Sequence, residues 1–458
     1  MTRRKAAVIS SALLLSLSLG AVAAAPPVTG DTARHPVGRN AMNVVDAIER
    51  SAHTLRTTDP RGSLKDLRAL GRMIGDADVV GLGEATHGSR DFFHMKHRIL
   101  RYLVEERGFR SFSAELPWGS GVRINEYVLY GKGDLHRIAR EEFQGPYRIC
   151  NNTDFLNLVE WMRAYNRHHP TDPVQFTGND MGYAGPELYR RVTDHVARTH
   201  PHLRARVATL YDGLAPATDA ATYLERYSEL PLAERRQRAE RTRAVVELLQ
   251  KQHPAPGTSR QQHLRTVQHA RAIHQLAAVY SYDFTDEAQV AEMMRYRDRV
   301  MAENVAWWRG HTGHRILLGA HNTHVSYDAF DHRYPKTQGA VLRDSLGGDY
   351  VSIGFSLHSG AFKAFGTDDN VIRTYRVDAA QPGSNEHTLD QARQRDYILD
   401  MRTAPRVVRT WLAEPRLTWN IGAGWPDPTE YRIALGEAHD VLIHLNEVEA
   451  TTYLGSNP

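Results

Sequence analysis

The sequence predicts an α/β protein with a parallel-sheet core flanked by helices on both faces and with a large helical insertion or lid. Short apolar segments alternate with longer amphipathic segments in the first part of the chain and again near its end, a pattern typical of βαβ units. Between residues 187 and 309 the chain is rich in Leu, Ala, Arg, Glu and Gln, and its only glycines are Gly213 and Gly257. That composition indicates a block of helices.

The individual elements follow from local patterns in chain order. Leu64, Leu67, Leu70 and Ile74 recur at helical spacing. Bounded apolar runs predict buried strands, and amphipathic runs predict the helices between them. The predicted strands are 78–82, 109–114, 174–177, 315–319, 350–355 and 440–445, and the predicted helices of the first part are 92–106, 122–129 and 155–167.

The order of these elements predicts how the chain is divided. Strands on both sides of the helical block fit one sheet, so we expect the block to be an insertion or lid and not a separate domain. The expected divisions are an α/β core over 41–186, the helical block over 187–309, and the second part of the core over 310–458.

The N-terminus resembles a secretory signal peptide. Basic residues at positions 3–5 precede an apolar run from Ala6 to Leu19 and the small residues that end at Ala25. We expect cleavage near Ala25, a flexible lead over 26–40, secretion, and no stable membrane insertion afterwards. A single membrane anchor is the alternative, although the apolar run is short for spanning a bilayer.

The composition excludes some classes of function. With 41% hydrophobic and 24% charged residues, the chain is of ordinary globular composition. Lys and Arg (57) nearly balance Asp and Glu (53), so we expect no nucleic-acid partner. The one cysteine, Cys150, cannot form an internal disulfide, and we assign it no chemistry.

Polar side chains follow three of the predicted strands. Glu84 and His87 lie in Gly83-Glu84-Ala85-Thr86-His87-Gly88 after the first strand, Glu115 follows the second, and His321 and His324 follow the strand at 315–319. Ligands collect at the carboxyl ends of parallel strands, so these side chains are candidates for one site. There are two alternatives. The segment from Gly83 to Gly88 could be only a glycine-rich turn with capping residues, and Glu115 could form only a structural ion pair.

The missing motifs narrow the chemistry. The sequence has no G-x-S-x-G, and the glycines around Ser120 have the wrong spacing for a nucleophile elbow. It also has no H-E-x-x-H, P-loop or G-x-G-x-x-G. His and Glu remain, and these side chains suit general-base attack by water at neutral pH.

Several blocks together resemble the erythromycin esterase family. They keep their order and span roughly residues 40 to 450. The blocks are 83–88, Phe92-Phe93, Lys96, Glu115, 161–166, Arg297-Asp298, 301–304 and 320–325.

The resemblance implies hydrolysis of a small-molecule ester or lactone without a covalent serine intermediate, with no cofactor and no metal. His87 is then the general base. Lys96 stands where macrolide-resistance members are expected to carry an arginine, which would donate through a bidentate fork. Glu84 and Glu115 would orient this base. His321 and His324 would form a histidine pair in the cleft. Lys96 and Asn322 would contact the substrate.

Other functions stay open. The same carboxylates and histidines suit a metal-dependent hydrolase, and a non-catalytic extracellular ligand-binding protein could keep the same cleft. An esterase that uses Ser120 is a third alternative. Export favours substrates met outside the cytoplasm, such as environmental lactones, ester-bearing antibiotics or envelope esters.

Overall fold

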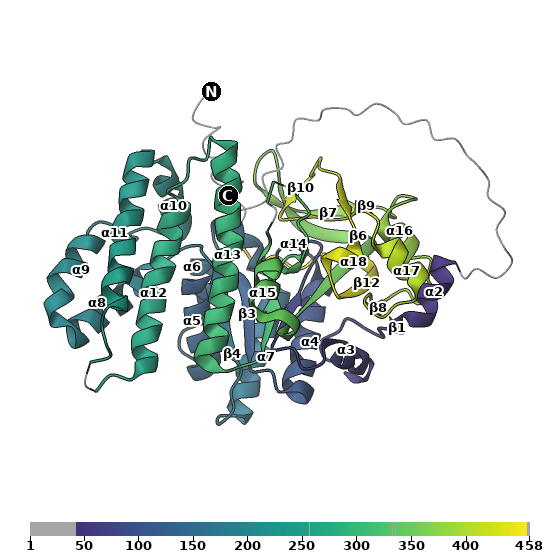
Figure 1. Cartoon of the computed structure of the whole chain (residues 1–458), viewed down its shortest axis with the longest axis horizontal. Helices are drawn as coiled ribbons and strands as arrows, with labels where there is room; N and C mark the ends of the chain where they lie inside the picture. Colours follow the sequence, from purple (N-terminus) through teal and green to yellow (C-terminus); the bar gives the residue numbers. More distant parts are fainter. Residues whose placement is uncertain (1–42, 256, 332, 335, 456–458) are drawn as a thin grey trace.

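The computed structural model describes residues 43–255, 257–331, 333–334 and 336–455 (Figure 1). The predicted signal peptide (1–25) and lead (26–40) lie outside the described residues. Within the described ranges, no helix is both long and apolar enough to cross a membrane.

A ten-stranded, mostly parallel sheet forms the centre of the protein. The strands β2, β3, β4, β5, β6 and β12 pair in parallel, whereas β1, β7 and β8 pair antiparallel at one side of the sheet. In order across the sheet the strands are β1 (His53–Thr54), β8 (Tyr397–Asp400), β12 (Val441–Val448), β6 (Tyr350–Gly366), β2 (Val79–Leu82), β5 (Ile316–Gly319), β3 (Ser111–Pro117) and β4 (Gln175–Asp180). β7 (Ile372–Val377) and β10 (Gly424–Trp425) also pair with β6, and β9 (Arg416–Thr418) and β11 (Tyr431–Ile433) form a separate small sheet.

Helices surround this sheet (Figure 1). In the first part of the chain they are α2 (Val44–Ser51), η1 (Lys65–Leu67), α3 (Arg68–Ile74), α4 (Arg90–Arg107), α5 (Trp118–Tyr130), α6 (Leu135–Glu142), η2 (Gly145–Cys150) and α7 (Thr153–His168). Between β4 and β5 lie α8 (Pro186–Thr199), η3 (Pro201–Leu203), α9 (Arg204–Tyr211), α10 (Ala220–Glu229), α11 (Leu232–Gln250), α12 (Arg260–Val279) and α13 (Glu287–Thr312). The last part contains α14 (Asn322–Val325), α15 (Gln338–Leu346), η4 (Gly347–Asp349), α16 (Asn385–Leu389), α17 (Arg406–Leu412) and α18 (Leu435–Ala438).

Alternate residues of the central strands bury against opposite layers of helices. Val80 and Leu317 belong to a core with side chains of α4 and α7, while their neighbours Val79 and Leu318 belong to a second core with α8, α12 and α13. Because successive strand residues point to opposite faces, strands that are apolar throughout must be covered on both faces. The predicted fold class is therefore confirmed.

The sequence located the parallel strands well and the antiparallel ones poorly. All six predicted strands are present, and the three predicted helices are α4, α5 and α7. The antiparallel strands β1, β7 and β8 were not predicted, because β1 has only two residues, both exposed, the central residues of β7 are exposed or half-buried, and the apolar run of β8 covers only three residues. The sheet is thus mostly, not wholly, parallel.

The residues between β4 and β5 form only helices, as predicted for this block. Figure 1 shows α8 to α12 beside the sheet, with α13 running across the front next to α15. α13 also contacts β4 and α15. Residues of α13 line the candidate active site described below.

Candidate active site

The neighbouring parallel strands β2, β5, β3 and β4 have their carboxyl ends on the same side of the sheet, and the candidate residues lie at these strand ends. Glu84 and His87 lie in the loop between β2 and α4, and Glu115 lies near the end of β3. His321 is the N-cap of α14, directly after β5, and His324 lies within α14. The structure therefore brings all five predicted residues together.

The loop that carries Glu84 and His87 packs closely on its surroundings. A Cβ atom at Gly83 would lie 2.1 Å from Oδ1 of Asn322, and one at Gly88 would lie 1.9 Å from the carbonyl oxygen of Lys363. Glycine is needed at both positions because any side chain would collide there. Ser89 then accepts a hydrogen bond from the backbone N–H of Phe92 and caps α4. The loop is thus held at both ends.

His87 is oriented by Glu84. The Nδ1 atom of His87 lies 2.7 Å from Oε1 of Glu84, and Nζ of Lys96 donates to Oε2 of the same carboxylate at 2.5 Å. Burial raises the pKa of Glu84, but the charge of Lys96 and the hydrogen bond with His87 outweigh burial and hold it below its ordinary value. An ionised Glu84 accepts the Nδ1–H, which leaves Nε2 of His87 as the basic nitrogen. No described residue hydrogen-bonds that Nε2.

Glu115 is held by cations and by a backbone amide. Its Oε1 accepts from Nη2 of Arg297 at 2.9 Å and lies 3.3 Å from Nε2 of His324. Its Oε2 accepts from the backbone N–H of His321 at 2.9 Å. Burial raises the pKa of Glu115, but the charges of His324, His87 and Arg297 hold it well below its usual range. Glu115 is therefore a carboxylate.

The two histidines after β5 are in different protonation states. Burial disfavours a charge on His324, but Glu115 and Asp298, whose Oδ1 lies 2.6 Å from Nδ1 of His324, raise its pKa to about 10. Burial and the nearby His87 lower the pKa of His321 to about 3. At neutral pH His324 is an imidazolium and His321 is uncharged, so the two rings have different electrostatic roles.

His321 is anchored by backbone groups. Its Nε2 lies 3.2 Å from the carbonyl oxygen of Ile421, and its Nδ1 accepts from the backbone N–H of Thr323 at 3.4 Å. Its ring centroid is 5.0 Å from that of His87. A carbonyl can only accept, so His321 carries its proton on Nε2 and presents a neutral ring to His87.

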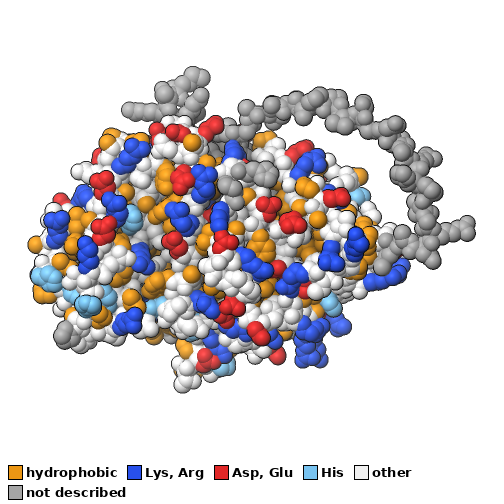
Figure 2. Space-filling model, viewed as in Figure 1, with side chains coloured by type: hydrophobic (Ala, Val, Ile, Leu, Met, Phe, Trp, Pro, Cys, Tyr) orange, Lys and Arg blue, Asp and Glu red, His pale blue; other side chains and the backbone are white. Residues whose placement is uncertain are grey.

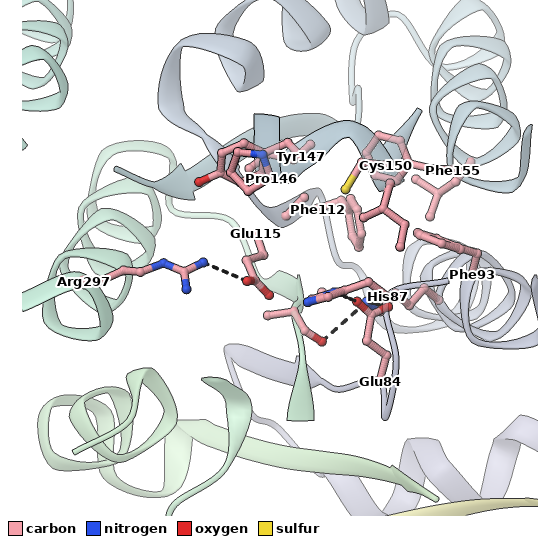
Figure 3. A pocket seen from close by; sticks show the side chains of 17 residues that line it. Glu84, His87, Phe93, Phe112, Glu115, Pro146, Tyr147, Cys150, Phe155 and Arg297 are labelled. Atoms are coloured by element: carbon pink, nitrogen blue, oxygen red, sulfur yellow. Dashed lines mark hydrogen bonds and ion pairs between the residues drawn. The ribbon is translucent and has the colours of Figure 1, made fainter. Parts of the chain in front are cut away.

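Two pockets meet at His87, Glu115 and Arg297, which line both. Figure 3 shows one of them, with Arg297 reaching Glu115 from one side and aromatic rings gathered on the other. Of the predicted histidines, His87 is the most exposed, with 17% of its side chain accessible. The aromatic side chains are Phe93, Phe112, Tyr147 and Phe155 in the first pocket and Phe330, Tyr334 and Tyr431 in the second.

The predicted substrate contacts are engaged with protein groups. Lys96 is buried and lines the first pocket, but its ammonium group is bonded to Glu84 and lies 3.5 Å from the carbonyl oxygen of Ala320. Asn322 donates through Nδ2 to the carbonyl of Phe355 and accepts the N–H of the same residue. That Lys96 and Asn322 contact the substrate therefore stays a prediction.

Three charged residues of the site had not been assigned a role. Arg297 and Asp298 come from α13, and Asp180 is the last residue of β4. Asp180 accepts from Nε and Nη2 of Arg297 and from the hydroxyl of Tyr147 at 2.9 Å. Asp180 could have been found by the strand-end argument that found Glu115. Arg297 and Asp298 stood in a family motif, but only packing shows which groups they touch.

Fold and site together define a hydrolase of α/β architecture with a histidine and carboxylate centre, and the comparisons with known proteins give its family. A sequence model described as erythromycin esterase matches residues 104–448. The chain therefore belongs to the erythromycin esterase family.

Individual relatives are distant in sequence and close in structure. The chain is similar to "Erythromycin esterase type II" of Escherichia coli, with 24% identity over 73% of this chain and 82% of the relative. A crystal structure of a Bacillus cereus protein superposes with a TM-score of 0.82 at 28% identity, covering 90% of this chain and 98% of the other. A mutant erythromycin esterase in its open conformation gives a TM-score of 0.67 at 17% identity, covering 87% and 98%, which shows the fold alone.

Proposed function

We propose that this protein hydrolyses a carboxylic ester or lactone by general-base catalysis, with water as the nucleophile and His87 as the base. The observation that carries the proposal is the His87–Glu84 contact of 2.7 Å, with the other ring nitrogen of His87 bound to no described residue at the place where two pockets meet. A carboxylate on one imidazole nitrogen fixes the tautomer and stabilises the imidazolium that forms.

The proposed reaction has two proton transfers. Nε2 of His87 takes a proton from water, and the oxygen of that water attacks the substrate carbonyl carbon. When the tetrahedral intermediate collapses, the C–O bond to the leaving group breaks and His87 returns the proton to the departing alkoxide. The base is thus regenerated in each cycle.

We assign the stabilisation of the oxyanion to Arg297. Its Nε and Nη2 are bound to Asp180 and Glu115, whereas Nη1 has no hydrogen-bond partner among the described residues, and the side chain lines both pockets. Lys96 and the protonated His324 are the other cations, but their donors are bonded to carboxylates. A donor aimed at an oxyanion is generally worth about 3 to 4 kcal/mol of barrier.

Water is favoured over a side-chain nucleophile. No serine is among the residues that line either pocket in the described part of the chain. Ser120 is buried and donates to Glu142 at 2.9 Å. Cys150 lines the first pocket, but burial raises the pKa of its thiol, so the reactive thiolate is disfavoured.

A metal-free mechanism is favoured over a metal-dependent one by the arrangement of the ligand atoms. The four carboxylates of the site are each bound to Arg297, Lys96 or a histidine, and they do not converge on one point. Among the described residues, the only group of three or more metal-ligand atoms that all lie within 4.8 Å of one another is elsewhere in the fold. Chelator treatment of the purified protein should therefore leave hydrolysis unchanged.

We also propose that the protein is exported and that its substrate is met outside the cytoplasm, on the strength of the basic and apolar pattern of residues 1–25. The residues between β4 and β5 would act as an insertion that shapes the pocket, since α13 supplies Arg297 and Asp298. Macrolides and simple lactones form the first substrate panel, because relatives carry erythromycin esterase names.

The test is incubation of the protein with this panel and detection of the hydrolysed product, heavier by one water, by mass spectrometry. We expect at least one ester to be opened and His87→Asn to abolish turnover while the circular dichroism spectrum and the melting temperature are retained. His94→Asn, on the first turns of the following helix, is the matched control. Full turnover by the His87→Asn variant would contradict the proposal, and binding without turnover by the unaltered protein would favour the non-catalytic alternative.

A further inference from the structure

Three buried histidines meet within the helical block, away from the candidate active site. His195 lies in the last turns of α8, His200 is the C-cap of the same helix, and His263 lies in the first turn of α12. One ring nitrogen from each lies within 4.8 Å of the others. The ring centroids are 5.7 to 6.1 Å apart. None of the three lines either pocket of the candidate site.

These rings are buried, and one nitrogen of each has no hydrogen-bond partner among the described residues. Their exposed fractions are 2% for His195, 6% for His200 and 5% for His263. Nε2 of His195, Nε2 of His200 and Nδ1 of His263 are buried nitrogens without a hydrogen-bond partner. An unsatisfied buried polar group destabilises the folded protein, and such groups are few in native proteins. Three of them in one place indicate a ligand that satisfies all three.

A metal ion is the ligand that three converging imidazole nitrogens suit best, because histidine is the commonest metal ligand in proteins. Neutral imidazole is the form that binds metals. The carbonyls of Leu249 and Gln252 interact with the His263 ring, and a backbone carbonyl that accepts from one ring nitrogen directs the other toward a metal.

We propose that His195, His200 and His263 bind a divalent transition-metal ion of the zinc type. Three imidazoles with one position left for water or another ligand form a recognised zinc donor set, with Zn–N distances of about 2.0 to 2.1 Å. Two ligands of a tetrahedral ion are then about 3.3 Å apart, so the present separations need to contract by at most about 1.5 Å. Calcium and magnesium require oxygen ligands, whereas the three atoms that meet here are imidazole nitrogens.

The position of the site determines what the ion does. It joins the end of α8 and the start of α12, two helices that pack on each other inside the second hydrophobic core. Figure 2 shows histidine atoms on the surface at the lower left, over the end of the molecule where Figure 1 places α8 and α9. His202 is exposed, and its ring centroid is 6.2 Å from that of His200. The ion therefore fastens the helical block and is not part of ester hydrolysis.

The experiment begins with the full-length protein stripped of metals by a chelator and dialysed. Zinc chloride is titrated in a calorimeter, and the melting temperature is measured with and without zinc. We expect one equivalent of zinc to bind with a submicromolar Kd and to raise the melting temperature. His195→Asn and His263→Gln should each weaken binding by about a hundredfold, while ester hydrolysis is unchanged.

Two controls separate this site from adventitious binding. His136→Gln removes an exposed histidine of α6, and the double variant His202→Asn/His253→Asn removes the exposed histidines nearest the cluster. Both should bind zinc as the unaltered chain does. Loss of binding in the double variant alone, or no stoichiometric binding at all, would overturn the proposal.

A spectroscopic measurement covers the case in which the ligand variants fail to fold. X-ray absorption of the zinc-loaded, unaltered protein should show three imidazole ligands at the first shell, and cobalt substitution should give the visible absorption of a four-coordinate ion. A first shell with fewer than three imidazoles, or one dominated by carboxylate oxygens, would refute the assignment.

Discussion

Replacement of Glu84 by glutamine removes the charge that orients and stabilises His87 while it preserves the size of the side chain. Oε1 of Glu84 is 2.7 Å from Nδ1 of His87, and the two charge centres are about 4 Å apart when the delocalisation of both groups is considered. At an effective dielectric constant of about 20, two unit charges at about 4 Å interact by roughly 4 kcal/mol. Since about 1.4 kcal/mol corresponds to tenfold in rate, Glu84→Gln should lower kcat roughly a thousandfold.

The same substitution leaves a buried cation without its partner. Nζ of Lys96 donates to Glu84 at 2.5 Å and is buried, and an unpaired buried charge is costly. The double variant Glu84→Gln/Lys96→Met removes both charges and is the matched control. We expect it to recover much of the thermal stability that the single variant loses, and to remain as slow.

The assay is the steady-state hydrolysis of the ester that turns over fastest in the panel, with kcat and KM measured from pH 5 to 9. Folding is checked by circular dichroism and thermal melting. If Glu84→Gln keeps kcat within tenfold of the unaltered protein, the orientation of His87 by Glu84 is not what activates water. Recovery of kcat in the double variant would equally refute the reasoning, because stability and not charge would then explain the loss.

Three further changes test the rest of the site. The pKa of His324 is raised to about 10 from an ordinary 6.5, so its protonation contributes stability that is fully present below pH 6.5 and is lost as pH rises through about 10. The unfolding free energy from urea titrations should therefore fall between these pH values. His324→Asn should remove this pH dependence. Arg297→Met leaves the buried carboxylate of Asp180 without its cation and should cost about 3 to 5 kcal/mol of stability together with activity, whereas Arg299→Met, at an exposed position of α13, should change the urea midpoint little. Ser120→Ala removes a hydroxyl that donates to Glu142 and should keep kcat within about twofold, and a fluorophosphonate should not label the protein; stoichiometric labelling would support the serine alternative.

The parts of the site that sequence could predict are those fixed by local order along the chain. Glu84, His87 and His321 each follow a short apolar strand, and parallel strands bring their carboxyl ends to one edge whatever the details of packing. Glu115 was expected after its strand, and a register irregularity between Ala114 and Pro117 places it within the end of β3. The strand-end rule was sufficient in all these cases.

The other features of the site depend on contacts between segments that are distant in the sequence, so the sequence alone could not predict them. Arg297 and Asp298 lie inside a 26-residue helix whose sequence is charged along much of its length, and nothing local distinguishes them from the exposed Arg299. Their burial follows from the packing of α13 on β4 and α15. The charge difference between His321 and His324 likewise depends on Asp298 reaching only one of the two rings, which sequence spacing does not show.

Lys96 illustrates how the structure changes the interpretation of a departure from the family pattern. As a substrate contact, a lysine in place of arginine would alter recognition directly. Here the ammonium group is buried against Glu84 and the carbonyl of Ala320. A planar guanidinium in its place would have five donors to satisfy. A lysine therefore suits a counter-ion that supports the base.

Substrate selection is then better explained by the pocket walls than by Lys96. Aromatic side chains line both pockets, three phenylalanines and Tyr147 in the first and two tyrosines and Phe330 in the second, and such side chains can select among bulky esters by shape. Because both pockets meet at His87, one can hold the acyl part and the other the alcohol part of an ester, with the carbonyl carbon between them. Changes at Phe155 or Tyr431 should therefore alter which ester reacts, through KM, while the pH dependence set by His87 and Glu84 stays the same.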